Sequence, residues 1–286
     1  IRKMIDTIRE KTGAGIRRIC IVLGWPRSSY YQASRPTKTE MEDQQIGDQI
    51  EKIFRKHLRR YGYRRVHDDL KDLEIKCGPA RVRRIMKQRG LYAIQPKNYI
   101  PRTSDGRADL PSPNLLLDRE DPCRLNEVWI GDITFIPTSV GWRYLAVVID
   151  LYSRRVVGWS LTDHLRADLV CDALRKALRS RSRDGELIFH SDRGSQYGSR
   201  SFRALLEKAG ITQSMSRRAN PYDNAWTESF MGTLKSEMLQ NGQFIDDRDA
   251  QIEIFSYIDG YYNTERKHSA LGYLSPSKFE LNHYEN

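Results

Sequence analysis

The feature that most constrains the fold is a change in hydrophobic pattern about two fifths of the way along the chain. Beyond it come five short apolar runs rich in β-branched and aromatic residues: 128–137, 142–152, 155–161, 187–191 and 211–216. The first three runs are separated only by short turns, which predicts an antiparallel meander of strands. The last two alternate with helical stretches, which favours parallel pairing. We therefore expect an α/β domain with a mixed five-stranded sheet and helices on its faces.

Ahead of this change the chain is predicted to be all helical. Residues 1–34 contain a helical apolar face that ends at Gly24, and a second helix is predicted after Pro26. Two short helices around a tight glycine turn fit a helix-turn-helix. A plain helical hairpin without DNA contacts is the alternative.

Residues 42–95 predict a second helical unit, in which the last of three helices is strongly basic. This helix starts at Pro79, a residue that suits the first helical turn, and Val82, Ile85 and Met86 form its apolar stripe. Its basic faces suit contact with a DNA groove or with phosphates, and a solvated charged face is the alternative. The candidate DNA-contacting residues of both helical units are Arg17, Arg18, Arg27, Arg64, Arg65, Arg81, Arg83, Arg84 and Lys87.

The charge of the chain is divided unevenly. Residues 1–107 carry 26 Lys and Arg against 12 Asp and Glu, whereas residues 108–286 carry 22 against 25. The formal net charge of +11 therefore originates entirely in the N-terminal part. Concentrated positive charge is expected of a nucleic-acid binder, because neutralising phosphates releases counterions. No apolar run of eighteen or more residues occurs, so no membrane partner is expected.

These patterns divide the chain into five segments. Five of the eleven prolines fall between the basic helices and the α/β domain, together with Ser, Asp and Gly, which is typical of an extended linker. The helix-turn-helix-like segment, the three-helix basic domain, the linker, the catalytic α/β domain and a C-terminal helical tail are predicted at 1–41, 42–95, 96–125, 126–242 and 243–286.

Three acidic residues lie where this order of elements brings them together. Asp132 is inside the first apolar run, where a charge is costly to bury unless it is paired or binds a metal. Asp192 follows the fourth strand at a turn that contains glycine, a common place for functional side chains in α/β sheets. Glu228 lies early in the last long helix. Each acid alone is more simply a surface carboxylate or a cap, so their joint placement is what indicates a catalytic site.

The helix predicted at 223–239 presents further candidates. Asn224 and Lys235 fall on the same face as Glu228, because steps of four and seven residues return to nearly the same side. Lys235 is a candidate for a DNA phosphate contact, with an exposed solubilising lysine as the alternative. A neighbouring face is predicted to pack on the sheet through Trp226, Phe230 and Leu234.

Carboxylates from three separate elements suit a pair of Mg²⁺ ions per active site. Mg²⁺ prefers oxygen ligands and is usually held by a few carboxylates, water and a substrate phosphate. Two such ions can activate the attacking oxygen and stabilise the leaving oxygen in a phosphodiester displacement. Water then makes the first cut, and a DNA 3′-hydroxyl makes the joining attack. Carboxylate sites accept Mn²⁺ as well.

The spacing of the acids is specific. Between Asp132 and Asp192 lie 59 residues, and between Asp192 and Glu228 lie 35. The sequence motifs around the three acids are WIGDIT, HSDRGSQY and DNAWTESFMGTLKSE, and the motifs YGYRRV and YNTERKHSALGY lie upstream and downstream of them. This pattern resembles retroviral integrases and, more closely, the OrfB-type DDE transposases of the insertion-sequence-three family. The resemblance covers nearly the whole chain.

The resemblance implies an RNase H-like core and a DNA transposase that moves its element by a copy-out, paste-in route. It implies that Asp132, Asp192 and Glu228 bind the metals and that Lys235 contacts DNA near the scissile phosphate. The implied partners are double-stranded DNA, both terminal inverted repeats and target, and further copies of the chain in a dimer or larger complex on DNA. Such an enzyme is expected in the bacterial cytoplasm, associated with the nucleoid.

Two departures limit what the resemblance implies. The zinc site of retroviral integrases has no counterpart here, because the four cysteines are scattered without a CxxC pair, so no zinc is expected. The family often gains an upstream segment by frameshifted fusion, and no sustained heptad pattern precedes residue 42. A DNA-binding regulator with a silent catalytic domain and an RNase H-like nuclease without joining activity are the alternatives.

Two other polar residues of the α/β domain are predicted to be structural. Asp150 ends the second apolar run and is expected to pair with Arg154 or Arg155. His190 lies two residues before Asp192 on the fourth strand.

Overall fold

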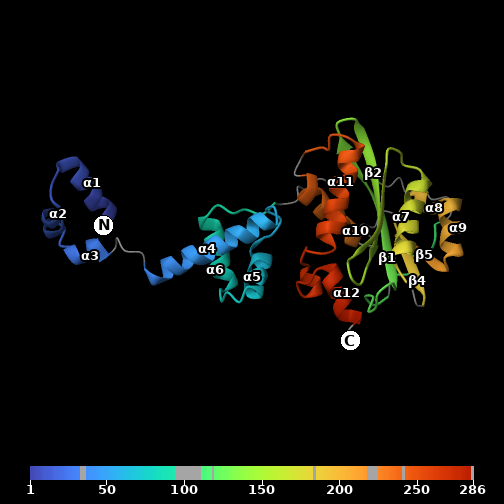
Figure 1. Ribbon diagram of the computed structural model, residues 1–286, viewed down its shortest axis with the longest axis horizontal. Helices are drawn as coiled ribbons and strands as arrows, with labels where there is room; N and C mark the ends of the chain where they lie inside the picture. Colours follow the sequence, from blue (N-terminus) through green and yellow to red (C-terminus); the bar gives the residue numbers. More distant parts are fainter. Residues whose placement is uncertain are drawn as a thin grey trace. The chain divides into compact units, whose positions relative to one another are not determined.

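The computed structural model describes residues 1–32, 37–94, 111–117, 119–182, 185–217, 225–239 and 242–284. The chain divides into two compact units, residues 1–93 and 94–286 (Figure 1). None of the helices in these described ranges is both long and apolar enough to cross a membrane.

The first unit is all helical. Its first three helices enclose a small core around Ile5, Ile19, Cys20 and Tyr30. The Tyr30 hydroxyl donates a hydrogen bond of 2.6 Å to Asp6. The helices of the unit are α1 (Arg2–Thr12), α2 (Ile16–Val22), α3 (Arg27–Gln32), α4 (Lys38–Lys56), α5 (Tyr63–Asp72) and α6 (Pro79–Gln88).

Helix α4 begins at Lys38, ahead of residue 42, where the second helical unit was predicted to start. Thr37 accepts a hydrogen bond from the backbone N–H of Glu40, and the Glu40 carboxylate accepts one from the backbone N–H of Thr37. This reciprocal capping box satisfies two backbone donors that a helix start otherwise leaves unpaired. The start of the helix is therefore set by its cap, ahead of its first buried side chain.

The second unit contains the predicted mixed sheet. Its strands are β1 (Val128–Thr138), β2 (Gly141–Asp150), β3 (Val156–Thr162), β4 (Leu187–Ser191) and β5 (Ile211–Met215). They are arranged in the order β3-β2-β1-β4-β5, with β1–β2 and β2–β3 antiparallel and β1–β4 and β4–β5 parallel. The prediction of an antiparallel meander followed by parallel strands is confirmed. β1 is buried on both faces, which explains its nearly continuous apolar sequence.

Helices cover both faces of the sheet (Figure 1). One face packs against α7 (Ala167–Ser180), α8 (Ser195–Gly198) and α9 (Arg200–Lys208). The other packs against α10 (Ala225–Leu234), which continues as a π-helical segment, η2 (Lys235–Leu239), and against α11 (Asp247–Phe255) and η3 (Ser256–Tyr262). Further along the chain lie η4 (Ser269–Leu271) and α12 (Pro276–Tyr284).

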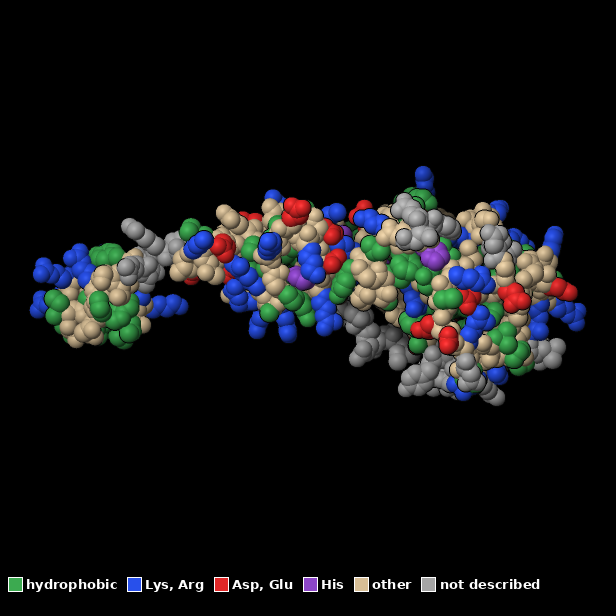
Figure 2. All heavy atoms as spheres, turned by 90° about the horizontal axis from the view of Figure 1, so that it is seen from below, with side chains coloured by type: hydrophobic (Ala, Val, Ile, Leu, Met, Phe, Trp, Pro, Cys, Tyr) green, Lys and Arg blue, Asp and Glu red, His purple; other side chains and the backbone are tan. Residues whose placement is uncertain are grey.

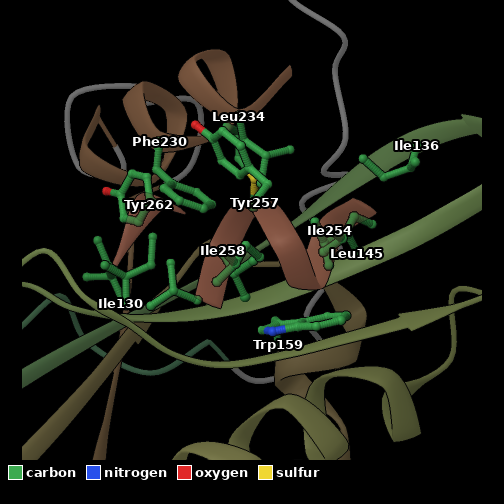
Figure 3. Packing of buried hydrophobic residues seen from close by; sticks show 14 of the residues in the cluster. Ile130, Ile136, Leu145, Trp159, Phe230, Leu234, Ile254, Tyr257, Ile258 and Tyr262 are labelled. Carbon is green, nitrogen blue, oxygen red and sulfur yellow. The ribbon is translucent and has the colours of Figure 1, made fainter. Parts of the chain in front are cut away.

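The C-terminal residues contribute directly to the core beneath α10. Ile254, Tyr257, Ile258 and Tyr262 lie among the side chains of α10 and the sheet, and Figure 3 shows them packed over Trp159 and its neighbours. Burial of large apolar side chains stabilises a fold by roughly 1.5–3 kcal/mol each. The segment that follows residue 243 is therefore part of what holds α10 on the sheet.

Polar contacts fix the same segment to the edge strand β3. The Asn263 side chain accepts a hydrogen bond from the backbone N–H of Val156 and donates one to its carbonyl, both at 3.0 Å. The amide thus substitutes for a neighbouring strand at this edge. Glu280, which is 2% exposed, accepts hydrogen bonds from Arg155 and Arg181, and these partners lower the pKa of its carboxyl against the effect of burial.

Candidate active site

A pocket of about 130 Å³ opens where β4 ends beside β1. Asp132 of β1 and Asp192, which follows β4, both line it. They lie side by side because β1 and β4 run parallel, with Gly131 paired to Ser191. Carboxyl ends of parallel strands meet at one edge of a sheet, the usual place for a site in α/β proteins.

Asp132 is a buried carboxyl group, 8% exposed. Its Oδ1 accepts a hydrogen bond of 2.8 Å from the backbone N–H of Ile133. Burial, and then the nearby carboxylate of Asp192, raise its pKa from 3.8 to about 8, and Glu228 adds to the rise while Lys235 opposes it. A site that gathers like charges in this way favours a bound cation.

The turn after β4 holds Asp192 in place. Its Oδ1 accepts a hydrogen bond of 2.9 Å from the backbone N–H of Gly194. A Cβ atom on Gly194 would lie 3.0 Å from the Asp192 carboxylate and from the Gln196 side chain. A side chain at this position would press against both of these groups, so glycine suits the close turn around the carboxylate.

Glu228 and Lys235 come from the helix on the other side of Asp132. Glu228 is exposed in the first turn of α10, and Lys235 is half-buried at its end. Burial lowers the pKa of the Lys235 ammonium group, and the Asp132 carboxylate acts in the opposite direction. Both residues are near enough to affect Asp132 electrostatically, but neither lines the pocket.

The three acids do not form a closed metal cage in this structure. Across the described ranges, no three His, Cys, Asp or Glu side chains are close enough together to hold one ion. The donor set nevertheless fits a hard divalent cation, because all three candidates are carboxylates, the ligands that Mg²⁺ prefers. Burial, and then the neighbouring Asp192 carboxylate, raise the pKa of Asp132, and a bound cation would act in the opposite direction.

Several residues of the pocket were not predicted. Tyr197 is fully buried beneath it, and burial together with Asp132 and Asp192 raises the pKa of its hydroxyl well above 10. Phe135 and Leu165 supply apolar walls. Tyr197 belongs to the sequence motif HSDRGSQY, but the motif alone does not indicate that the turn brings this side chain into the lining of the pocket.

The end of the α10–η2 helix is fixed by a buried ion pair. Arg266 donates to both carboxylate oxygens of Glu237 at 2.9–3.2 Å, and the Tyr257 hydroxyl donates to the same group at 2.9 Å. Glu237 and Arg266 are 6% and 5% exposed. Despite its burial, Arg266 has a raised pKa because of Glu237. The downstream motif YNTERKHSALGY therefore holds the α10–η2 helix through its arginine, Arg266.

The start of α10 is held differently from our prediction. Trp226 does not pack into the sheet core: it is 46% exposed, and the Arg154 guanidinium lies 3.7 Å from its ring centroid. Such a cation–π contact stabilises an exposed aromatic without burying it. The prediction of a four-residue apolar stripe was thus correct for Phe230 and Leu234 and wrong for Trp226.

Asp150 and His190 both lie buried outside the pocket. Asp150 accepts hydrogen bonds from the backbone N–H groups of Asn126, Tyr152 and Ser153 at 2.8–3.2 Å. The prediction that it pairs with Arg154 or Arg155 was wrong, because it caps the turn after β2 instead. The His190 ring lies between the hydroxyl groups of Ser214 and Ser216 at 2.8 and 3.1 Å.

The predicted DNA-contacting arginines and lysine of helix α6 fall into two groups. Arg81 and Arg84 bind Asp43 of α4 at 2.7 and 2.6 Å and lower the pKa of its carboxyl. Arg83 and Lys87 are exposed, and Arg83 lies over the ring of Tyr63. In the view of Figure 2, Lys and Arg side chains crowd the surface of this unit.

The remaining candidates lie elsewhere in the first unit or outside the described residues. Arg64 stacks over Tyr63, and Arg65 over the buried Tyr61. Arg17, Arg18 and Arg27 are exposed on α2 and α3. Asn224 falls outside the described residues.

Comparison with known proteins gives consistent matches. The family model "Integrase core domain" matches residues 123–221, a second model of that description matches 209–276, and "HTH-like domain" matches 41–99. The transposase for insertion sequence element IS904 of Lactococcus lactis is 40% identical over 86% of this chain and 97% of its own length. Transposase InsF for insertion sequence IS3A of Escherichia coli is 36% identical over 97% and 98%.

Two solved structures are similar at lower levels. A simian T-cell lymphotropic virus intasome chain shares 17% identity with a TM-score of 0.46, over 71% of this chain and 66% of that one. The HTLV-2 integrase catalytic core in complex with magnesium shares 16% identity with a TM-score of 0.41, over 54% and 95%.

The sheet order and the family models define a protein with an RNase H-like integrase core and an N-terminal HTH-like domain. This is the architecture of a polynucleotidyl transferase. The chain belongs to the IS3 family of transposases, as its identity with curated members over most of its length shows.

Proposed function

We propose that the chain is a DDE transposase that cuts and joins DNA at the ends of an insertion sequence, with divalent cations held by Asp132, Asp192 and Glu228. The observation that carries the proposal is the pairing of Asp132 and Asp192 in one pocket, where burial and mutual repulsion raise the pKa of Asp132. A cation held there would polarise the scissile phosphate and lower the pKa of an attacking hydroxyl group.

The chain's own residues position the acids and the substrate. The β1–β4 pairing fixes Asp132 against Asp192, while the buried Tyr197 forms part of the lining of the pocket. The half-buried Lys235 ammonium supports Asp132 electrostatically, and in this scheme it would meet a DNA phosphate. Glu228, exposed on α10, completes the ligand set when the helix and the DNA come together.

No side chain in this scheme acts as a covalent nucleophile. Water attacks the phosphorus atom at the element end, and the bond to the leaving 3′-oxygen breaks to give a free 3′-hydroxyl. That hydroxyl then attacks a second phosphodiester, so one bond is exchanged for another and no external energy source is required. The same pocket serves both steps.

The proposed DNA partners follow from the charged surfaces. Arg83 and Lys87 of α6, with Arg64 beside Tyr63, form the surface that would contact the terminal repeats. Arg81 and Arg84 are proposed instead to hold α6 against α4 through Asp43. Because two element ends must be brought together, we expect the active form to contain at least two copies of the chain.

The test is a nicking and joining assay on DNA from the element's own ends, with Mg²⁺ or Mn²⁺. Wild type should form nicked and joined products, and Glu228→Gln should form neither while it retains DNA binding. Ser236→Ala is a suitable control on the same helix, because its hydroxyl only bonds a backbone carbonyl. Nicking without joining would indicate a nuclease, and tight binding without chemistry in the wild type would indicate a regulator.

A further inference from the structure

Three aromatic side chains form a surface beside the pocket. Phe135 and Tyr144 are directly opposite each other across the β1–β2 hairpin, and Trp142 lies diagonally from Phe135. The ring centroids of Phe135 lie 5.1 Å from Tyr144 and 6.2 Å from Trp142, both edge to face. We name Phe135, Trp142 and Tyr144 the aromatic platform.

The platform is exposed at one end and continuous with the catalytic pocket at the other. Trp142 is 59% exposed. Phe135 lines the same pocket as Asp132 and Asp192. Trp142 contacts the Phe135 ring that lines the pocket, so a strand that enters the pocket would cover this exposed indole.

The chemistry of the platform suits a nucleobase better than a phosphate. Arg143 lies between Trp142 and Tyr144 in sequence, so its side chain leaves from the opposite face of the strand, where it forms an ion pair with Asp247. The platform itself carries no charge. Uncharged aromatic rings bind bases by stacking, whereas phosphates require cations.

The size of the platform argues against a protein partner. A stable protein interface buries about 800 Å² on each side and uses 20–30 residues. Three rings cover far less, although they match the faces of one or two bases. Phe135 lies three residue steps along β1 from Asp132, about 10 Å, which corresponds to about three stacked base steps of a DNA strand.

We propose that the aromatic platform stacks an unpaired nucleobase of the DNA strand that enters the pocket, within about three nucleotides of the scissile phosphate. Because the rings are edge to face, a base would stack on the face of one of them, and it can do so only after it leaves the duplex, so the platform would stabilise a frayed or flipped end. The inference rests on the proposed function, because it takes the strand in the pocket to be the one that is cut.

The first experiment measures binding without chemistry. The full chain is titrated in EDTA with element-end DNA that carries 2-aminopurine at each of the three positions flanking the cleavage site. One position should change in fluorescence with wild type and lose the change with Trp142→Ala, with affinity reduced about ten- to a hundredfold. Phe255→Ala, an aromatic side chain 60% exposed on α11, should behave as wild type.

A double-mutant cycle between protein and DNA completes the test. An abasic site at the responding position should weaken wild type as much as Trp142→Ala does, and the two changes together should weaken binding no further. Phe135→Leu, which keeps an apolar side chain in the wall, should give an intermediate loss. Additive losses, equal affinity of wild type and Trp142→Ala, or a changed oligomeric state without a fluorescence change would overturn the inference. Failure of the wild type to nick the same DNA would count against the proposed function alone.

Discussion

Replacing Asp132 by asparagine should stabilise the metal-free protein while it abolishes DNA cleavage. The carboxyl group is buried, and its pKa is raised from 3.8 to about 8, above its unfolded value. A carboxyl group with a raised folded pKa destabilises the fold at any pH above the unfolded pKa, and the loss is complete above the folded pKa. Asparagine has nearly the same shape and carries no charge.

The size of the change in stability follows from the difference between the folded and unfolded pKa values of Asp132. From pH 3.8 to pH 7 each pH unit costs about 1.4 kcal/mol, so the carboxyl group costs roughly 4 kcal/mol at pH 7. A buried amide costs about 1–3 kcal/mol in its place. The net gain is about 2 kcal/mol, which for a unit of this size raises Tm by roughly 4–8 °C. At pH 5 the carboxyl group costs only about 1–2 kcal/mol, so the gain should vanish there.

The assay is thermal unfolding of wild type and Asp132→Asn in EDTA between pH 5 and pH 8, followed by circular dichroism. Asp150→Asn is the matched control: burial raises the pKa of that carboxyl as well, but asparagine replaces the oxygen that accepts from the backbone N–H of Asn126 by an NH2 group, so Tm should not rise as it does for Asp132→Asn. Added Mg²⁺ should raise the Tm of wild type and not of Asp132→Asn. A less stable Asp132→Asn at pH 8 in EDTA, or an equal rise with Mg²⁺ in both proteins, would refute the reasoning.

Three further predictions concern the remaining charged groups. Arg83→Gln combined with Lys87→Gln should weaken DNA binding for all sequences and reduce the salt slope by about 2, measured by fluorescence anisotropy; an unchanged slope would exclude both from phosphate contact. Arg81→Gln should slightly lower the midpoint of urea unfolding of the N-terminal unit and leave the salt slope unchanged; a lower slope would contradict its role with Asp43. Glu237→Gln should cost about 3–5 kcal/mol in chemical denaturation because it leaves Arg266 buried without its carboxylate, and a cost below 1 kcal/mol would show that the pair is not essential to the helix.

The fold was predictable wherever local pattern decides structure. The short turns after the first two apolar runs left little choice but antiparallel hairpins, and the helices before β4 and β5 required parallel crossovers. The start of α4 was also readable, because Thr37 and Glu40 have the spacing of a capping box. The apolar periodicity alone indicates a later start, because the first buried residues of α4 lie well beyond its cap.

The site was predictable only in part, because its remaining contacts join residues far apart in sequence. The period of the last long helix placed Trp226 with Phe230 and Leu234, but Arg154 of the β2–β3 turn draws the indole to the surface. Glu237 and Arg266 are 29 residues apart, and no local pattern pairs them. The charge of α6 likewise did not show which arginines α4 already binds.

The most direct test of the account is the position of the metal. Crystals of the full chain bound to an element end, grown with Mn²⁺ and measured for anomalous scattering, would locate it. The account predicts Mn²⁺ about 2 Å from carboxylate oxygens of Asp132, Asp192 and Glu228, with Glu228 brought in by movement of α10. Mn²⁺ held without Glu228, or bound outside the pocket that Asp132 and Asp192 share, would contradict the proposed three-carboxylate site.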